Sequence, residues 1–171
     1  MRKLLFVSSI IVLASQDIDA QAKSIFFEFG GNGLGISANF DSRFTKSDKG
    51  FGFRVGFGFL PGLNAKDLNS GQTVLSTPTL ISIPVGINHL AGNAPNYFES
   101  GLGIDYVHIS GNYGFFGDNV HVNGSGVLFI PSIGYRHARA GKAFQYRIVL
   151  SPLIGSGGAA FFGGFSLGFK F

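Results

Sequence analysis

The pair of residues with the clearest capacity for chemistry is His108 and Ser110, two positions apart. A histidine can act as general base to a serine nucleophile when a carboxylate orients the imidazole. This stretch alternates as a β-strand does, so both side chains point to the same face. No glutamate occupies that face on a neighbouring predicted strand. We therefore predict no catalytic residue and interpret the pair as polar side chains at a strand end, with a lipid-acting hydrolase as the less favoured alternative.

The remaining histidines do not predict a metal site. His89, His121 and His137 fall in separate connections or strand ends, without the spacing of a metal-ligand set. The chain contains no cysteine, and no stretch resembles a phosphate loop or a cofactor motif. Although the formal net charge is +4, the basic residues form no run. We expect no cofactor, no metal and no nucleic-acid partner.

Charged residues recur at alternate positions of the predicted strands, opposite an apolar face. Buried isolated charges are costly, so side chains of both signs that share one narrow interior are expected to pair. Two readings stay open, an ion-pair network that fills the interior and the polar lining of a narrow pore. The residues of this predicted network are Glu28, Asp41, Arg43, Arg54, Glu99, Asp105, Arg136, Arg147 and Lys170.

Eight segments with period-two alternation must position these side chains. The clearest, Phe51–Phe59, places aromatic residues and valine on one face and Gly or Arg on the other. This periodicity is typical of β-strands. The predicted strands are Ser24–Gly30, Leu34–Phe44, Phe51–Phe59, residues 80–89, 97–108, 127–136 and 143–150, and Phe161–Phe171.

The composition indicates which solvent the apolar faces meet. Hydrophobic residues make up 45% of the chain and charged residues 13%, and there are 20 Phe and 27 Gly. A soluble, lipocalin-like barrel would turn its apolar faces inward, but eight strands enclose a space just wide enough for side chains. Several large apolar residues from every strand could not fit there. We therefore predict an all-β, eight-stranded antiparallel up-and-down transmembrane barrel with its apolar face toward lipid.

The connections between predicted strands alternate in length. Transmembrane barrels have short periplasmic turns and long extracellular loops, so both termini are expected in the periplasm. The first outer connection, Gly31–Gly33, is predicted to be a tight hairpin turn because it contains Asn32-Gly33. The short connections are Thr45–Gly50, Ala91–Asn96 and Arg139–Lys142, and the long ones are Pro61–Val74, Ser110–Gly126 and Ser151–Gly158.

One long connection carries exposed aromatic residues. Tyr113, Phe115 and Phe116 lie among Gly and Asn in Ser110–Gly126. Aromatic residues on an outer loop can anchor a partner, or they can fold onto the rim of the barrel. They are the predicted contact residues for an unknown protein or ligand.

Residues 1–22 are predicted to be a signal peptide. Arg2 and Lys3 precede the apolar run Leu4–Ala14, and Ala20-Gln21-Ala22 supplies small residues at a cleavage site. The apolar run is too short to span a bilayer, which takes about 20 residues. The predicted domains are therefore 1–22, the signal peptide, and 23–171, the barrel.

The chain resembles the small eight-stranded outer-membrane barrels of Gram-negative bacteria, which include the OmpA-type transmembrane domain. The signal peptide, the alternating segments and the terminal phenylalanine carry the resemblance. It implies that the barrel-assembly machinery reads Phe169 and Phe171 during biogenesis. The His108-Ile109-Ser110 stretch also loosely resembles the lipid A deacylase barrels, whose His and Ser act with a Glu.

The function predicted from these observations is a structural or interaction role in the cell outer membrane, with a lumen closed by polar side chains. Outer-membrane lipids are the expected surroundings. The alternatives are a narrow porin-like channel for small solutes and, less favoured, a lipid-modifying enzyme.

Overall fold

The computed structural model describes residues 22–171 except 69–70, 72, 116–117 and 156–157. The described chain is all-β, with one short 3₁₀ turn. No described helix is long and apolar enough to cross a membrane. The elements are β1 (Lys23–Gly30), η2 (Gly31–Gly33), β2 (Gly35–Arg43), β3 (Gly50–Leu60), β4 (Leu63–Lys66), β5 (Thr73–Thr77), β6 (Thr79–Asn93), β7 (Asn96–Phe115), β8 (Asp118–Ala138), β9 (Phe144–Gly155) and β10 (Gly158–Lys170).

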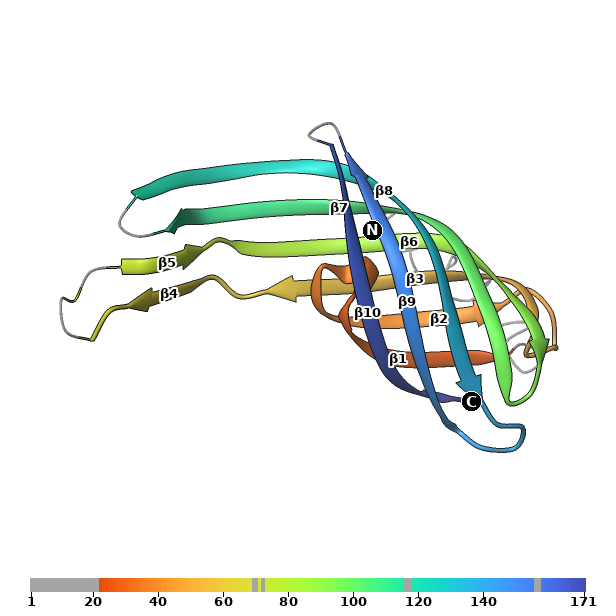
Figure 1. Ribbon diagram of the computed structural model, residues 1–171. Helices are drawn as coiled ribbons and strands as arrows, with labels where there is room; N and C mark the ends of the chain where they lie inside the picture. The colour runs from red at the N-terminus through yellow and green to blue at the C-terminus, as the bar shows by residue number, and fades with distance from the viewer. Residues whose placement is uncertain (1–21, 69–70, 72, 116–117, 156–157) are drawn as a thin grey trace, which may run out of the picture.

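Eight of these strands close into an antiparallel barrel, as Figure 1 shows. Each of these eight strands pairs with the next of the eight along the chain, so β3 pairs with β6. β1 closes the ring by pairing with β10. Main-chain hydrogen bonds between Lys23 and Phe171 extend this last seam. The predicted fold class, an eight-stranded up-and-down barrel, is confirmed. Closure leaves the barrel wall without the unpaired edges that an open sheet would expose.

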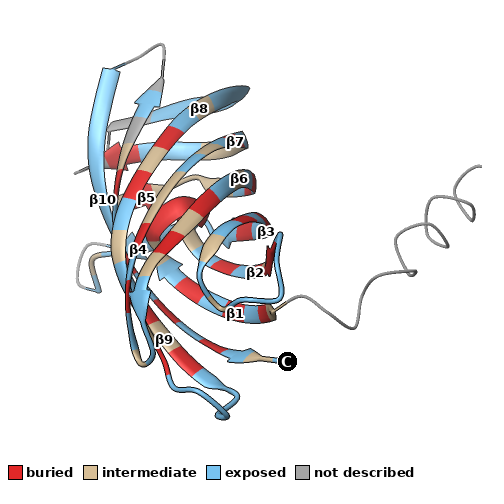
Figure 2. Cartoon of the chain, turned by 90° about the vertical axis from the view of Figure 1, so that its right-hand side faces the viewer, coloured by how far each residue is buried: buried red, intermediate tan, exposed pale blue. Residues whose placement is uncertain are grey.

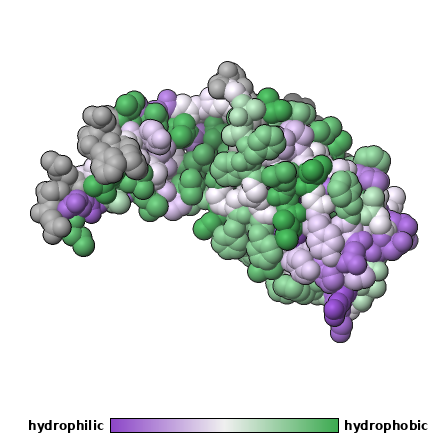
Figure 3. All heavy atoms as spheres, in the orientation of Figure 1, coloured by the Kyte–Doolittle hydropathy of each residue, from purple (hydrophilic) through white to green (hydrophobic). Residues whose placement is uncertain are grey.

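Side chains alternate between the two faces of the barrel wall. Phe27 and Phe57 point outward and are 57% and 55% exposed, although both lie within strands. The neighbouring Glu28 points inward and is fully buried. Apolar residues cover the wall in Figure 3, while hydrophilic residues gather at one end. The outer surface is therefore the apolar one, and the interior is polar.

The two ends of the barrel differ. The start of β1, the end of β10 and the connections 44–49, 94–95 and 139–143 lie at one end, called here the turn end. At the other, the hairpin end, β4 and β5 prolong β3 and β6, and β7 and β8 run on beside them. β5 pairs with β7 through Leu75 and Phe115. A four-stranded arm thus projects beyond the barrel.

The paired strands at the hairpin end, in the arm and in the β9–β10 hairpin, correct three predicted connections. The segments Pro61–Val74, Ser110–Gly126 and Ser151–Gly158 were predicted to be long connections between strands, but much of each is paired strand. The pairing of β7 with β8 continues without a register change from Asn96 to Phe115. Continued pairing satisfies main-chain donors and acceptors that an irregular loop would leave to water. The Gly and Asn content of these segments misled the loop prediction.

The first hairpin connection also differs from the prediction. Instead of a tight outer turn, Gly31–Gly33 forms η2, a 3₁₀ turn whose three residues are buried. Leu34 follows in a left-handed conformation with φ 55°. Figure 2 shows this buried coil within the ring of strands. The turn folds inward because side chains of the barrel interior bind its main chain, as described below.

Candidate functional site

The candidate site is a cluster of charged side chains inside the barrel, toward its turn end. Its arginines come from β2, β3, β8 and β9, and its carboxylates from β1, β2 and β7. Each occupies an inward position of its strand. Glycines on the same face leave room for them. At Gly52, for example, a Cβ atom would lie 2.4 Å from Cζ of Arg43.

Glu99 is one centre of the cluster. Arg54 donates to its Oε1, and the Nε of Arg136 donates to Oε2 at 2.9 Å. Nη1 of Arg147 lies 3.6 Å from Oε1. Glu99 therefore meets three guanidinium groups from three different strands. Such an arrangement offsets the desolvation cost of a buried carboxylate, which is 1% exposed here.

Asp41 is the second centre. Nη2 of Arg43 lies 2.6 Å from Oδ1, and Nη2 of Arg136 lies 3.2 Å from Oδ2. Asn88 joins the two centres, because its Nδ2 donates to Oδ2 of Asp41 at 2.5 Å and to Oε1 of Glu99 at 3.3 Å. Arg136 joins them as well. The two acids thus belong to one connected network across the interior.

Glu28 extends the network toward η2. Arg147 donates to its Oε2 at 2.5 Å, and the hydroxyl of Ser166 donates to the same oxygen at 2.9 Å. The other oxygen, Oε1, accepts the main-chain N–H of Asn32 at 2.9 Å. One carboxylate therefore binds an arginine of β9 and the inward turn at the same time.

Four arginines face three carboxylates in this cluster, which leaves a formal charge of +1. The ring of Phe26 lies against the excess positive charge. Its centroid is 5.1 Å from Cζ of Arg54 and 4.8 Å from Cζ of Arg147. A cation over an aromatic face is attracted to the ring, more strongly where water is excluded. Phe26 is 3% exposed.

Two of the nine predicted network residues lie outside the cluster. Lys170 pairs with Asp48 at 2.7 Å, at the partly exposed turn end. Asp105 is fully buried nearer the hairpin end, beside Ser82 and the main chain of Ile83, and makes none of the ion pairs found among the described residues. The structure brings the other seven together.

Sequence reasoning did not identify the inward turn as part of the interior. Ser151 donates to Oδ1 of Asn32 at 2.6 Å, and Ser82 donates to the carbonyl of Gly33 at 2.9 Å. Leu34 packs with Ile130 into a small apolar layer, which Leu80, Val107 and Leu128 border. The three consecutive residues Gly31, Asn32 and Gly33 fitted an outer turn equally well, so no local signal distinguished the two.

Little space is left around these side chains. A cavity beside Arg54, Asn32 and Ser132 measures about 20 Å³. A second, between Asp41, Lys170 and the turn end, also measures about 20 Å³. Each is close to the smallest volume that holds a single water molecule, about 10–15 Å³.

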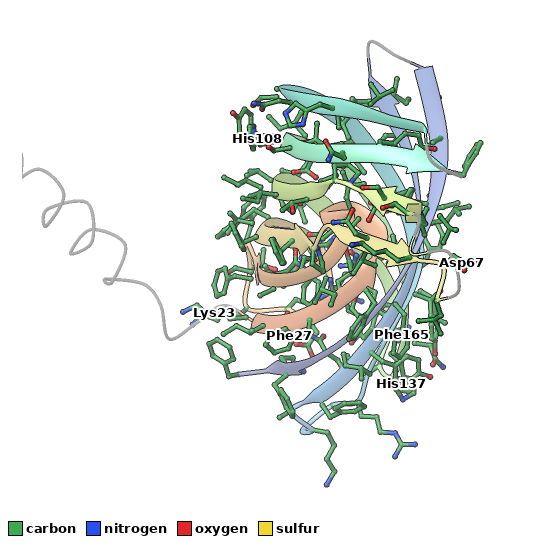
Figure 4. The ribbon with its side chains drawn as sticks, turned by 90° about the vertical axis from the view of Figure 1, so that its left-hand side faces the viewer. Lys23, Phe27, Asp67, His108, His137 and Phe165 are labelled. Carbon is green, nitrogen blue, oxygen red and sulfur yellow. The ribbon has the colours of Figure 1, made fainter. Side chains whose placement is uncertain are left out.

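His108, of the pair that could do chemistry, has a partner on the neighbouring strand. Nδ1 of His108 lies 2.9 Å from Oγ of Ser125 on β8. Within the described residues, His121 contacts Asn112, and His137 contacts Tyr135 and Asn96 at the turn end, far from His108 (Figure 4). No described group of His, Asp and Glu could hold a metal ion.

Two of the three predicted contact residues, Tyr113 and Phe115, lie on the arm. Tyr113 on β7 is 61% exposed, and its cross-strand neighbour Val120 is 62% exposed. Phe115 ends β7, and only its main chain is described. Phe116 falls outside the described residues, as does the predicted signal peptide up to residue 21.

The predicted assembly residues lie on the outer surface at the turn end. Phe169 packs edge-on against Phe144 of β9, with 6.2 Å between ring centroids. The main-chain N–H of Phe171 donates to the carbonyl of Lys23 at 2.9 Å. Both rings are more than half exposed. Farther along β10, Phe165 points outward in the same way (labelled with Phe27 in Figure 4).

No protein-family model matches the chain, and no curated protein matches it in sequence. Solved structures do match. The N-terminal β-barrel domain of Pseudomonas aeruginosa OprF aligns with TM-score 0.55 and 12% identity, over 88% of this chain and 96% of that one. Ail, the attachment invasion locus protein of Yersinia pestis, aligns with TM-score 0.52 and 13% identity, over 88% and 97%. At these identities the likeness establishes the fold, that of the small eight-stranded outer-membrane barrels.

Proposed function

We propose that this protein is an integral outer-membrane protein whose interior is closed to solutes and which acts in the cell envelope through its architecture and its projecting arm. The outward face of the barrel supports the membrane location. Large apolar side chains such as Phe27, Phe57 and Ile104 are each more than half exposed. Water-soluble monomers rarely expose apolar patches larger than a few hundred Å².

The outer face becomes polar at the hairpin end, which supports a membrane boundary there. Tyr106 and Val127 face each other on β7 and β8, and the next outward pair is His108 with Ser125. At the turn end, Tyr135 and His137 both pack against Tyr146 on the outside. Aromatic residues of this kind line the headgroup regions of transmembrane barrels. The short turns then lie in the periplasm, and the arm lies outside the cell.

The connected network of Glu28, Asp41 and Glu99 with four arginines carries the proposal of a closed interior. It draws side chains from β1, β2, β3, β7, β8 and β9, and η2 lies against it. The cavities beside its arginines, among the described residues, measure about 10 and 20 Å³. An ion would have to displace ion pairs that are held from several strands. The surface left for interaction is the arm, where Tyr113 and Val120 present a paired apolar contact.

Single-channel recording tests this proposal against a narrow channel. The protein without residues 1–22 is refolded into a planar bilayer, and folding is verified by heat-modifiable gel mobility. We expect a silent membrane over a range of voltages. Variants Arg54→Ser and Arg147→Ser, which remove charge from the network, should stay silent or open only irregularly.

Discrete openings of the wild-type protein that change in size in either arginine variant would overturn the closed interior. The narrow channel would then replace it, because a conducting path would have to pass these guanidinium groups. The Lys66→Ser variant is the matched control, since it removes one positive charge from the arm instead of the interior.

A further inference from the structure

The wall of the barrel is interrupted between β8 and β9. Phe129 pairs with Ile154, and Ile133 pairs with Leu150 in the same register, but residues 130–132 and 151–153 do not pair with one another. That register places Pro131 opposite Pro152. Both prolines keep their partners on the far side, Leu102 on β7 and Phe161 on β10. On these two strands the interruption is therefore confined to the side where β8 and β9 face each other, and a shorter gap, beside Pro84, lies between β3 and β6.

The two prolines make this interruption tolerable. A main-chain N–H without a partner is expensive where water is excluded. Proline has no N–H, and within sheets it is normally confined to edges and bulges. With a proline on each side, neither strand has a donor to offer across the centre of the seam. The sequence thus permits a break in pairing here at lower cost than where the facing residues carry N–H groups.

A hollow of about 460 Å³ lies on the outer face beside this seam. Its volume is that of a small-molecule site, about 300–1,000 Å³, and far exceeds the interior cavities. Outward side chains of β3 and of β6 to β10 line it. They include Phe51, Leu102, Ile133, Leu150 and Phe161, together with the two prolines.

One end of the hollow is polar. His89 and Ser100 face each other across β6 and β7, toward the turn end, and both line the hollow. The imidazole of His89 packs on Phe51, with 4.6 Å between ring centroids. The remaining outward side chains of the lining are apolar, and the buried, inward-facing Asn88 and Ser132 also contribute to it. A molecule that fits must therefore carry a long apolar part and a polar end that reaches His89 and Ser100.

We propose that this hollow binds one acyl chain of a phospholipid from the leaflet at the turn end, with the headgroup at His89 and Ser100. The inference rests on the proposed membrane location, because the hollow opens on the apolar outer face. The hollow at the seam is a fixed recess, whereas lipids elsewhere on the outer wall exchange freely with the bilayer. One phospholipid is then held in place among the mobile ones.

Lipid retention tests the inference. The protein is refolded in vesicles of phosphatidylethanolamine and phosphatidylglycerol, extracted into mild detergent, and weighed by native mass spectrometry. We expect one retained phospholipid per wild-type chain. Ile133→Trp fills the hollow and should lower retention about tenfold, as displacement of a few buried methylenes predicts. Leu167→Trp is the matched control, since Leu167 also points outward but lies on β10 away from the hollow.

The outcomes separate the two proposals. Equal retention by both tryptophan variants, or a folded wild-type protein without retained lipid, would overturn the lipid site and leave the membrane location standing. A protein that does not enter vesicles, shown by flotation and by heat-modifiable mobility, would overturn the membrane location itself. The chain contains no tryptophan, so the fluorescence of each variant reports independently that its new side chain lies in lipid.

Discussion

Arg136 is the residue on which the interior network depends most. Its guanidinium reaches both Asp41 and Glu99, and so joins carboxylates of β2 and β7 from β8. Buried ion pairs stabilise little in net terms, because desolvation opposes attraction. Removing one partner is different, since it leaves buried charge without compensation. The network is better understood as a set of mutually dependent charges than as a sum of favourable pairs.

Arg136→Met should lower the free energy of unfolding by about 3–5 kcal/mol, because two carboxylates lose a partner in a buried setting. Urea unfolding of the vesicle-inserted protein, followed by tyrosine fluorescence, measures the loss. Lys170→Met is the control. Its pair with Asp48 is partly exposed and is worth about 0–1 kcal/mol. Similar losses in the two variants would contradict the dependence on burial.

Among the elements, η2 fills part of the barrel interior. β10 leaves room for η2 because it has a glycine where the two meet. A Cβ atom on Gly164 would lie 2.6 Å from Cα of Gly31, which is main chain and cannot swing away. A Cβ atom on the adjacent Gly163, which points outward, would meet nothing within 4 Å. Two neighbouring glycines of one strand thus have opposite tolerance for a methyl group.

Gly164→Ala should lower the free energy of unfolding by about 1–3 kcal/mol, as overpacking of a filled interior does. Gly163→Ala should change it by no more than about 0.5 kcal/mol. Thermal unfolding in detergent, read by circular dichroism in the β region, compares the two. Equal melting temperatures would mean that η2 does not pack against β10 in this way.

The whole molecule combines a closed apolar wall, a turn end and a projecting arm, and these parts predict its orientation. Lys66 ends β4 on the arm and is exposed. Other basic residues lie in the connections at the turn end, namely Lys46, Lys49, Arg139 and Lys142. The barrel wall keeps trypsin from reaching the buried arginines, whichever side of the membrane the enzyme is on.

Trypsin added to intact cells should therefore cleave after Lys66 and leave the barrel folded. The turn-end sites should be cleaved only after the membrane is permeabilised. Mass spectrometry of the released fragments identifies the sites, and Lys66→Gln should remove the first cut. Cleavage at Arg139 or Lys142 in intact cells would reverse the orientation.

The amino-acid sequence by itself determined the features that repeat locally. Period-two alternation identified eight wall strands and the outward face, and it placed Glu28, Arg54 and Glu99 on the inward face, because each of these depends only on neighbouring residues. Alternating connection lengths predicted different ends, although not the paired arm. These predictions hold where side-chain direction follows directly from position along a strand.

Only the tertiary structure decided which inward charges meet. Glu99 of β7 binds Arg54 of β3 and Arg136 of β8 because strand register and closure bring them to one level. The same non-local pairing places Pro131 opposite Pro152 and leaves Asp105 apart from the cluster. Register is set by hydrogen bonds between strands and by the packing of one face, not by the order of residues within a strand. The inward fold of Gly31–Gly33 likewise depends on acceptors and donors from β1, β6 and β9 that meet it only once the barrel has closed.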